Sequence, residues 1–97
     1  MRLEFHRLVA SDVSQIMRYY EDVVGPQLAT EFYNELRAAF VRAAESPEAF
    51  AVRERDIRRV NLDRFPYHFL FRVVGDTVRV LVVRHHRRSP AVGRERQ

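Results

Sequence analysis

Residues 65–90 read FPYHFLFRVVGDTVRVLVVRHHRRSP, which is two apolar, valine-rich runs on either side of a Gly75-Asp76 step. β-branched and aromatic residues favour strands, and a Gly-Asp pair between two such runs is typical of a two-residue β-hairpin turn. The stretch therefore predicts an antiparallel hairpin in which Val74 pairs with Thr77.

The predicted register gives the hairpin two different faces, because successive side chains in a strand alternate. One face is almost wholly apolar and is expected to receive the helices. Its residues are Tyr67, Phe69, Phe71, Val73, Val78, Val80 and Val82, and Arg84 lies at its end opposite Tyr67. The opposite face pairs Arg72 with Arg79 and also carries His68 and His85. His86 shares the parity of the core-facing residues and is expected to cap the edge of the core.

Arg72 opposite Arg79 is an unusual feature, because like charges directly opposite each other destabilise a sheet. The pair indicates an anion or an acidic partner on that face. Two long side chains splayed into water would fit the same residues, and a one-residue bulge would change the pairing. These alternatives are open from the sequence alone.

Two amphipathic helices are predicted ahead of the hairpin. One apolar stripe runs over residues 13–24, after Ser11 or Asp12 as a suitable N-cap, and the Gly25-Pro26 step ends it. A second stripe runs over residues 29–44. A tight Gly-Pro turn between two such helices predicts an antiparallel helical hairpin.

Further strands are predicted on both sides of the helices. Residues 2–8, RLEFHRL, alternate polar and apolar side chains, which is typical of a short strand. Residues 46–56, SPEAFAVRERD, are expected to end the second helix and form a loop, after which Val60 and Leu62 alternate with polar neighbours in another strand. The order is β-α-α-β-β-β, an α+β fold with an N-terminal strand, a helical hairpin and a three-stranded antiparallel meander.

Length and composition are those of a small globular domain. The 97 residues suit one domain over residues 1–97, with a polar tail from about residue 91. There is no cysteine, which excludes disulfides and thiolate catalysis. No apolar run is long enough for a signal peptide or a membrane span, so we expect a cytoplasmic protein without membrane contacts.

Positive charge is concentrated in the second half of the chain. Residues 1–50 contain 5 Arg against 8 Asp and Glu, a net charge of −3, whereas residues 51–97 contain 12 Arg against 5 Asp and Glu, a net charge of +7. All 17 basic residues are Arg. A GC-rich genome would explain the absence of Lys but not this asymmetry, which indicates an acidic partner, either nucleic acid or an acidic protein.

The HHRR sequence at residues 85–88 excludes some chemistry. Neighbouring strand residues point to opposite faces, so His85 and His86 cannot easily chelate one ion, and the adjacent arginines disfavour a cation further. Ser89 lacks the Gly-x-Ser-x-Gly elbow of a hydrolase, and three glycines are too few for a nucleotide-binding loop. We therefore expect no metal and no cofactor.

Acid–base cleavage of RNA and simple anion binding are both open. Histidine suits proton transfer near neutral pH, and arginine suits the charge of a phosphate, so the face with His68 and His85 beside Arg72 and Arg79 could cleave RNA. Strand histidines without any chemistry fit the same residues. Binding demands less, and the candidate basic rim is Arg58, Arg59, Arg64, Arg87 and Arg88.

The order of several elements resembles the RelE/ParE superfamily of bacterial type II toxins. These elements are Arg59 on a strand, Phe65-Pro66-Tyr67, Phe71-Arg72, the Gly75-Asp76 turn, a Val-rich strand from Val78 to Val83, and a His-x-Arg-Arg-x-Pro ending from His85 to Pro90. The helical turn and the SPEAF segment after the second helix are also similar to the family. The resemblance covers roughly residues 3 to 90.

The resemblance implies the α+β fold and a cognate antitoxin whose C-terminal segment wraps and neutralises the toxin. RelE-type members cleave mRNA on the ribosome with clustered basic residues and a C-terminal Tyr or His, whereas ParE-type members inhibit DNA gyrase and depend on a basic C-terminal region. His68 stands where the nucleases commonly carry a catalytic Arg, and the ending AVGRERQ contains neither Tyr nor His. Both departures favour the ParE-type branch.

We therefore expect a ParE-like toxin that inhibits DNA gyrase by binding rather than by catalysis. The residues expected to bind the target or the antitoxin are Arg58, Arg59, Arg72, Arg79, His85, Arg87 and Arg88. The alternative is a ribosome-dependent mRNA endonuclease with His68, Arg72, His85 and Arg88 as catalytic residues. A third hypothesis is an inactive relic that binds only its antitoxin.

Overall fold

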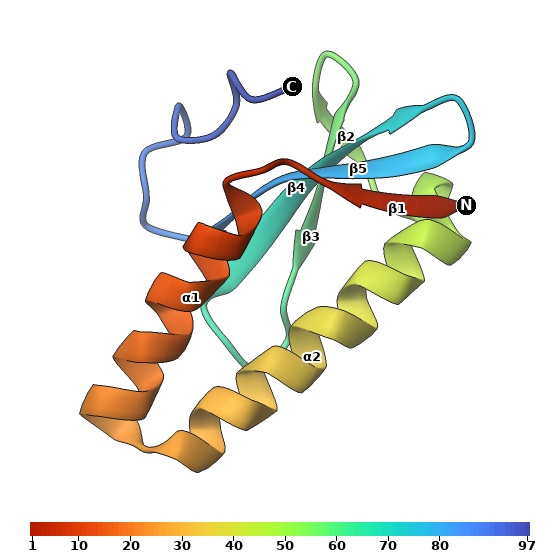
Figure 1. The fold of residues 1–97 in the computed structure, drawn as a ribbon. Coiled ribbons are helices and arrows are strands. Elements are labelled where there is room, and N and C mark those ends of the chain that lie inside the picture. Colours follow the sequence, from red (N-terminus) through yellow and green to blue (C-terminus); the bar gives the residue numbers. More distant parts are fainter.

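Two helices and a five-stranded sheet make up the fold, which a computed structural model describes over residues 1–97 (Figure 1). The strands are β1 (Arg2–Phe5), β2 (Val52–Glu54), β3 (Ile57–Asn61), β4 (Tyr67–Val74) and β5 (Thr77–His85). The helical segments are α1 (Val9–Tyr19), the π-helical turn η1 (Tyr20–Val24), α2 (Pro26–Glu45) and the 3₁₀ turn η2 (Pro47–Ala49). The predicted α+β class is confirmed, with one strand more than expected.

The strands are arranged in the order β1-β5-β4-β3-β2. β3, β4 and β5 form the predicted antiparallel meander, and β1 lies parallel to β5. The prediction of a loop over residues 46–56 is wrong in part, because Val52–Glu54 pairs with β3 as an antiparallel edge strand. A tight turn that places Arg55 at a φ of 54° joins the two strands. Three exposed residues are too few to show an alternation in the sequence.

The first helix begins earlier than the sequence predicts. Its first residue is Val9, and the turn before it is closed by His6, whose Nδ1 accepts a backbone N–H at 3.1 Å. The predicted N-cap at Ser11 or Asp12 is therefore wrong. Asp12 instead reaches the sheet, where its carboxylate accepts the backbone N–H of Val83 at 3.1 Å.

The Gly25-Pro26 step separates the two helices, as predicted. Gly25 has a φ of 152°, which L side chains rarely adopt, and it donates its N–H to the carbonyl of Tyr20. Pro26 is the first residue of α2, where a missing N–H costs nothing. The helices diverge from this turn and lie against the same face of the sheet, which we call the front face (Figure 1). Neither helix combines the length and the apolar character that a bilayer crossing requires.

The main core lies between the helices and the front face. Phe32 and Leu36 of α2 are fully buried against Phe69 and Phe71 of β4 and the valines of β5. An aromatic cluster extends this core to the Phe-Pro-Tyr segment. Its members are Tyr20, Phe32, Phe65 and Tyr67, with ring centroids 5.3 to 6.1 Å apart. Edge-to-face aromatic contacts of this kind add to the burial energy and fix how the turn docks on the sheet.

The β4–β5 register is confirmed near the turn and wrong beyond it. The pairs from Val74 with Thr77 to Phe71 with Val80 are as predicted, including Arg72 opposite Arg79. A bulge at Leu81 then shifts the partners by one residue. The shifted pairs are Leu70 with Val82, Phe69 with Val83, His68 with Arg84 and Tyr67 with His85.

The bulge has a physical cause on the rear face of the sheet. Leu81 and Val82 are consecutive in the chain, yet both are buried there with Ile57 and Leu70 in a second, smaller core. Two adjacent apolar side chains can share one face only if the strand gains a residue. The prediction that β5 alternates to its end did not allow for this rear core.

Residues 87–97 turn back from β5 and pack on its rear side. Gly93 lies so close to Val82 that an added Cβ would be 2.5 Å from the Val82 Cβ, and its φ is 85°. Arg96 pairs with Asp12 at 2.7 Å and donates to the carbonyl of Leu81. Buried Arg84 donates to two carbonyls of this segment. The C-terminal segment is therefore held mainly by guanidinium hydrogen bonds and covers the rear core.

Candidate functional site

Two histidines form the centre of a site on the rear face, at the end of β5. His68 is 1% exposed, whereas His86 is exposed and its ring stacks on that of His68, with centroids 5.1 Å apart and planes 13° apart. The two Nδ1 atoms are 2.9 Å apart, and Arg84 Nε donates to His68 Nε2 at 2.9 Å. A guanidinium can only donate hydrogen bonds, so His68 Nε2 is the acceptor of the bond from Arg84. The proton of the neutral His68 ring is therefore on Nδ1, which donates to His86 Nδ1.

The surroundings keep this histidine pair neutral. Burial, reinforced by the charges of Arg59 and Arg84, lowers the pKa of His68 to about 3. Burial and then Arg59 and His85 also lower the pKa of His86. A neutral His68 with both ring nitrogens engaged has no proton to exchange with a substrate near neutral pH.

Arginines surround the histidine pair, and we call this cluster the basic corner. Its residues are Arg53, Arg59, Arg84, His68 and His86. Arg59 donates from Nε to the Asn61 amide oxygen at 2.7 Å, and its Nη2 lies 3.4 Å from His86 Nδ1. Burial and Arg53 lower the pKa of Arg59. Burial, and then Arg59, Arg94 and Arg88, lower that of Arg84. The corner is thus a concentration of like charge.

The structure does not bring the four candidate nuclease residues together. His68 is buried, and Arg72 lies further along the hairpin toward its turn, where it faces Asp56 at 3.5 Å. The prediction that His85 shares the face of Arg72 is wrong, because the bulge turns His85 to the front, where it packs edge-on against Tyr67.

The remaining candidate arginines have separate surroundings. Arg58 donates to the Phe50 carbonyl at 2.7 Å and holds the segment after α2. Arg79 contacts Glu4 at 3.4 Å and the backbone oxygen of Gln97. Arg87 and Arg88 are exposed beyond the end of β5. Arg64 pairs with Glu31 of α2. The predicted basic rim is therefore divided among several elements rather than gathered at one site.

The sequence interpretation missed two members of the basic corner. Arg84 was placed opposite Tyr67 on the front face and His86 at the edge of the core, whereas both lie on the rear face with His68. The consecutive apolar residues Leu81 and Val82 are the signal that could have indicated the bulge, and with it the exchange of His85 for His86.

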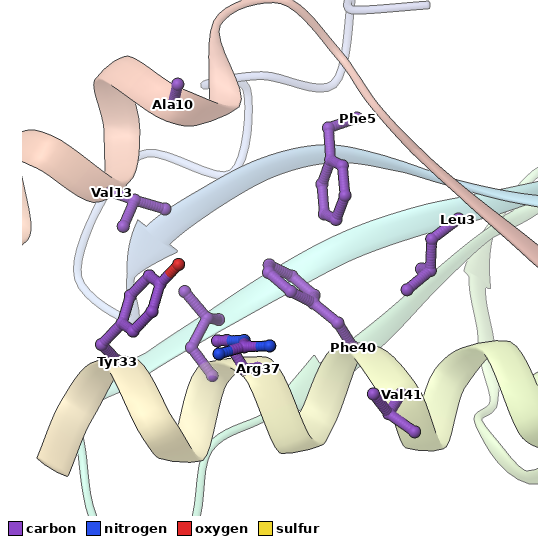
Figure 2. Close-up of a pocket in the computed structure, with 9 residues that line it drawn as sticks. Leu3, Phe5, Ala10, Val13, Tyr33, Arg37, Phe40 and Val41 are labelled. Atoms are coloured by element: carbon purple, nitrogen blue, oxygen red, sulfur yellow. The ribbon is translucent and has the colours of Figure 1, made fainter.

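A second candidate surface is an apolar groove on the helical side of the sheet (Figure 2). It has a volume of about 470 Å³ and lies where α1, α2 and β1 diverge. Its lining residues are Leu3, Phe5, Ala10, Val13, Tyr33, Leu36, Arg37, Phe40 and Val41. Phe5 of β1 meets Phe40 of α2 edge-on at 5.0 Å, yet Phe5 is 45% exposed and Val41 is 50% exposed. Arg37 is the one basic residue that lines this groove, and its guanidinium lies over the Tyr33 ring.

Comparisons with known proteins identify relatives of the chain. A family model described as "ParE toxin of type II toxin-antitoxin system, parDE" matches residues 3–90. Toxin ParE2 from Mycobacterium tuberculosis, in strains CDC 1551 / Oshkosh and ATCC 25618 / H37Rv, is 28% identical over 89 residues, which covers 92% of this chain and 85% of the relative.

Solved structures share the fold. One of the chromosomal ParDE toxin–antitoxin system from P. aeruginosa matches with a TM-score of 0.77 at 24% identity, covering 88% of this chain and 95% of the other. The isolated E. coli RelE toxin matches with a TM-score of 0.59 at 21% identity, covering 92% and 87%.

Proposed function

The chain belongs to the ParE toxin family of type II toxin–antitoxin systems, and we propose that it acts by binding DNA gyrase and inhibiting it. We further propose that a cognate antitoxin neutralises it by occupying the apolar groove. The alternative within the superfamily, ribosome-dependent cleavage of mRNA, would need positioned proton donors and acceptors.

The observation that carries the proposal is the state of the histidines. His68 is buried, neutral and bonded at both nitrogens, and His85 lies on the other face. Arginine is a poor proton donor or acceptor because its pKa is above ~12. The rear face therefore offers positive charge without a proton-transfer pair, which suits binding better than cleavage.

The exposed arginines beyond β5 support a binding role for this end of the molecule. Arg87 and Arg88 form no ion pair, so their charges are free to meet an acidic surface. Charge of one sign on an accessible edge speeds encounter with a partner of the opposite sign. Gyrase bound to DNA offers such a partner.

The apolar groove supports the antitoxin part of the proposal. Exposed aromatic and aliphatic side chains on α2 and β1 surround a groove of a size that an amphipathic helix can fill. β1 is also an edge strand of the sheet, so an extended segment could pair beside the same groove. Arg37, which has no carboxylate partner, would favour an acidic residue in the segment that docks.

A supercoiling assay with purified gyrase tests the target. We expect the chain to block supercoiling or to leave cleaved DNA, and the double variant Arg87→Ala/Arg88→Ala to weaken this effect at least tenfold. The matched control is Arg18→Ala/Arg42→Ala, which removes two exposed charges from the helices. The cognate antitoxin, added in equal amount, should restore supercoiling.

Other outcomes would contradict the proposal. Cuts at defined codon positions in translated mRNA, with gyrase unaffected, would establish the nuclease alternative instead. If neither activity is found and overexpression does not slow growth, the chain is a relic that binds only its antitoxin.

A further inference from the structure

Strand β1 is one edge of the sheet, and its outer backbone groups are open to another strand. The N–H groups of Arg2 and His6 donate to carbonyls of the β4–β5 turn and of β5, at 3.0 and 2.8 Å. Backbone groups point alternately to the two sides of a strand, so the even-numbered residues face β5, whereas Leu3 and Phe5 face outward. The outward N–H and C=O groups of these two residues form a template for strand pairing.

The front side of this edge is apolar. Phe5 of β1 and Val41 of α2 are both exposed, and both line the groove between the helices and the strand (Figure 2). Leu3 is half-buried at the same edge. Open backbone groups beside exposed apolar side chains favour association with another chain.

The rear side of the same edge carries one cation and one anion. Arg2 is exposed and forms no ion pair within the chain. The side chain of Glu4 is 51% exposed and contacts Arg79 at 3.4 Å. Residues two apart in a strand lie on one face, so both charges can take a partner from a strand added to this edge.

The pattern of β1 is complementary to itself in one antiparallel register. Outward-facing residues must oppose outward-facing residues, so a two-fold axis passes through a residue and not between two. An axis at Leu3 sets Arg2 of each copy opposite Glu4 of the other. An axis at Arg2 or at Glu4 would instead place like charges opposite each other, which is destabilising. An axis at Phe5 would pair β1 with residues beyond its end, where the chain turns into α1.

We propose that two copies of this chain dimerise through β1, with Leu3 on the two-fold axis and one sheet continuing through both copies. The two Leu3 residues exchange their N–H···O bonds, and Arg2 pairs with Glu4 in both directions on the rear face. On the front face, Phe5 and Val41 become covered. A four-residue strand and the rim of a groove form a small interface, so we expect a dissociation constant in the micromolar range.

The dimer does not depend on gyrase inhibition or on an antitoxin. A chain that lacked either property would carry the same edge. An antitoxin segment that paired with β1 would compete with the second copy, because one edge accepts one strand.

Exchange of the two charges tests the interface. Arg2→Glu and Glu4→Arg each place like charges opposite each other in a homodimer, so each variant should dimerise at least tenfold more weakly than the parent. A mixture of the two variants restores both opposite-charge pairs in a heterodimer, which should form as readily as the parent dimer. Sedimentation equilibrium of the full chain from about 10 to about 500 µM measures these constants. The matched control Arg53→Glu makes the same charge change on β2, the other edge strand, and should dimerise as the parent does.

Amide hydrogen exchange followed by NMR locates the contact in the parent chain. The N–H groups of Leu3 and Phe5 should exchange rapidly in dilute solution and slowly at concentrations where the dimer predominates. The N–H of His6 is bonded to β5 in either state, so its protection should not depend on concentration.

The proposal is overturned if the parent is monomeric at every concentration, if the two variants form no heterodimer, or if dimerisation leaves the Leu3 and Phe5 amides unprotected. It is equally overturned if these amides are protected only when the cognate antitoxin is added, because the edge then serves the antitoxin alone. Should Glu4→Arg fail to fold through loss of its contact with Arg79, the concentration dependence of exchange in the parent decides the question.

Discussion

Replacing Asp12 with alanine should destabilise the fold more than any other change of a carboxylate in this chain. Asp12 lies on α1, but its carboxylate is 15% exposed and accepts three hydrogen bonds. One comes from the backbone N–H of buried Val83 at 3.1 Å, and two come from Arg96 at 2.7 and 3.2 Å. One side chain thus connects the first helix, strand β5 and the C-terminal segment.

The expected loss is the sum of two effects. The Val83 N–H is left buried without an acceptor, which costs about 1–3 kcal/mol. The ion pair with Arg96 adds about 1 kcal/mol, because the freed guanidinium can move into water with its segment. Asp12→Ala should therefore lower the free energy of unfolding by about 3 kcal/mol. For a domain of this size, that loss corresponds to a melting temperature roughly 15 °C lower.

Urea unfolding followed by circular dichroism measures this loss. The matched control is Asp22→Ala, an exposed carboxylate on η1, which should change stability by less than about 0.5 kcal/mol. Arg96→Ala should cost only about 1 kcal/mol, because Asp12 keeps its bond to Val83. If Arg96→Ala costs as much as Asp12→Ala, the bond to the strand contributes nothing and the reasoning fails.

Three further predictions follow from the same structure. Burial and neighbouring arginines lower the pKa of His68 to about 3, so below about pH 6.5 the unfolded chain binds a proton at this residue and the folded chain does not. The free energy of unfolding should therefore fall by a few kcal/mol as the pH drops from about 6.5 toward 3. His68→Asn should reduce this pH dependence, measured by urea unfolding. Gly93 has a φ of 85° and lies against Val82, so Gly93→Ala should release the C-terminal segment from the sheet. The release should shift the Val82 methyl signals in NMR, and unchanged signals would contradict this packing. Val41→Glu in the groove should weaken antitoxin binding at least a hundredfold by calorimetry, whereas Val23→Glu, outside the groove, should not.

Most of the fold could be predicted because its signals are local. The Gly75-Asp76 turn and the Gly25-Pro26 step each depend on residues that are neighbours in the chain, and both are confirmed. The edge strand β2 was missed because three exposed residues carry no alternation. The start of α1 was misplaced because its closing contact comes from His6, whereas the better N-cap residue, Asp12, is used by a strand 71 residues away.

The candidate site was harder to predict because it depends on a single bulge. Arg72 opposite Arg79 lies on the turn side of Leu81, and that pair is confirmed. Beyond Leu81 every side chain of β5 lies on the opposite face from the one predicted. His85 is therefore on the front face and His86 on the rear face, the reverse of the prediction. Regular alternation does not predict a bulge, which arises here because Leu81 and Val82 are both buried on the rear face with Ile57 and Leu70.

The bulge also explains why His68 is bonded at both ring nitrogens rather than free to exchange a proton. In a regular strand, His68 would face Val83 and be accompanied by His85, with no cation bonded to its ring. The bulge instead brings Arg84 to His68 Nε2 at 2.9 Å and His86 to its Nδ1 at 2.9 Å. Each contact removes one of the two positions at which His68 could exchange a proton. The Nδ1 edge of His86, which lies beside Arg59, is in turn occupied by the His68 proton, so this end of the rear face offers positive charge without a free proton-transfer pair.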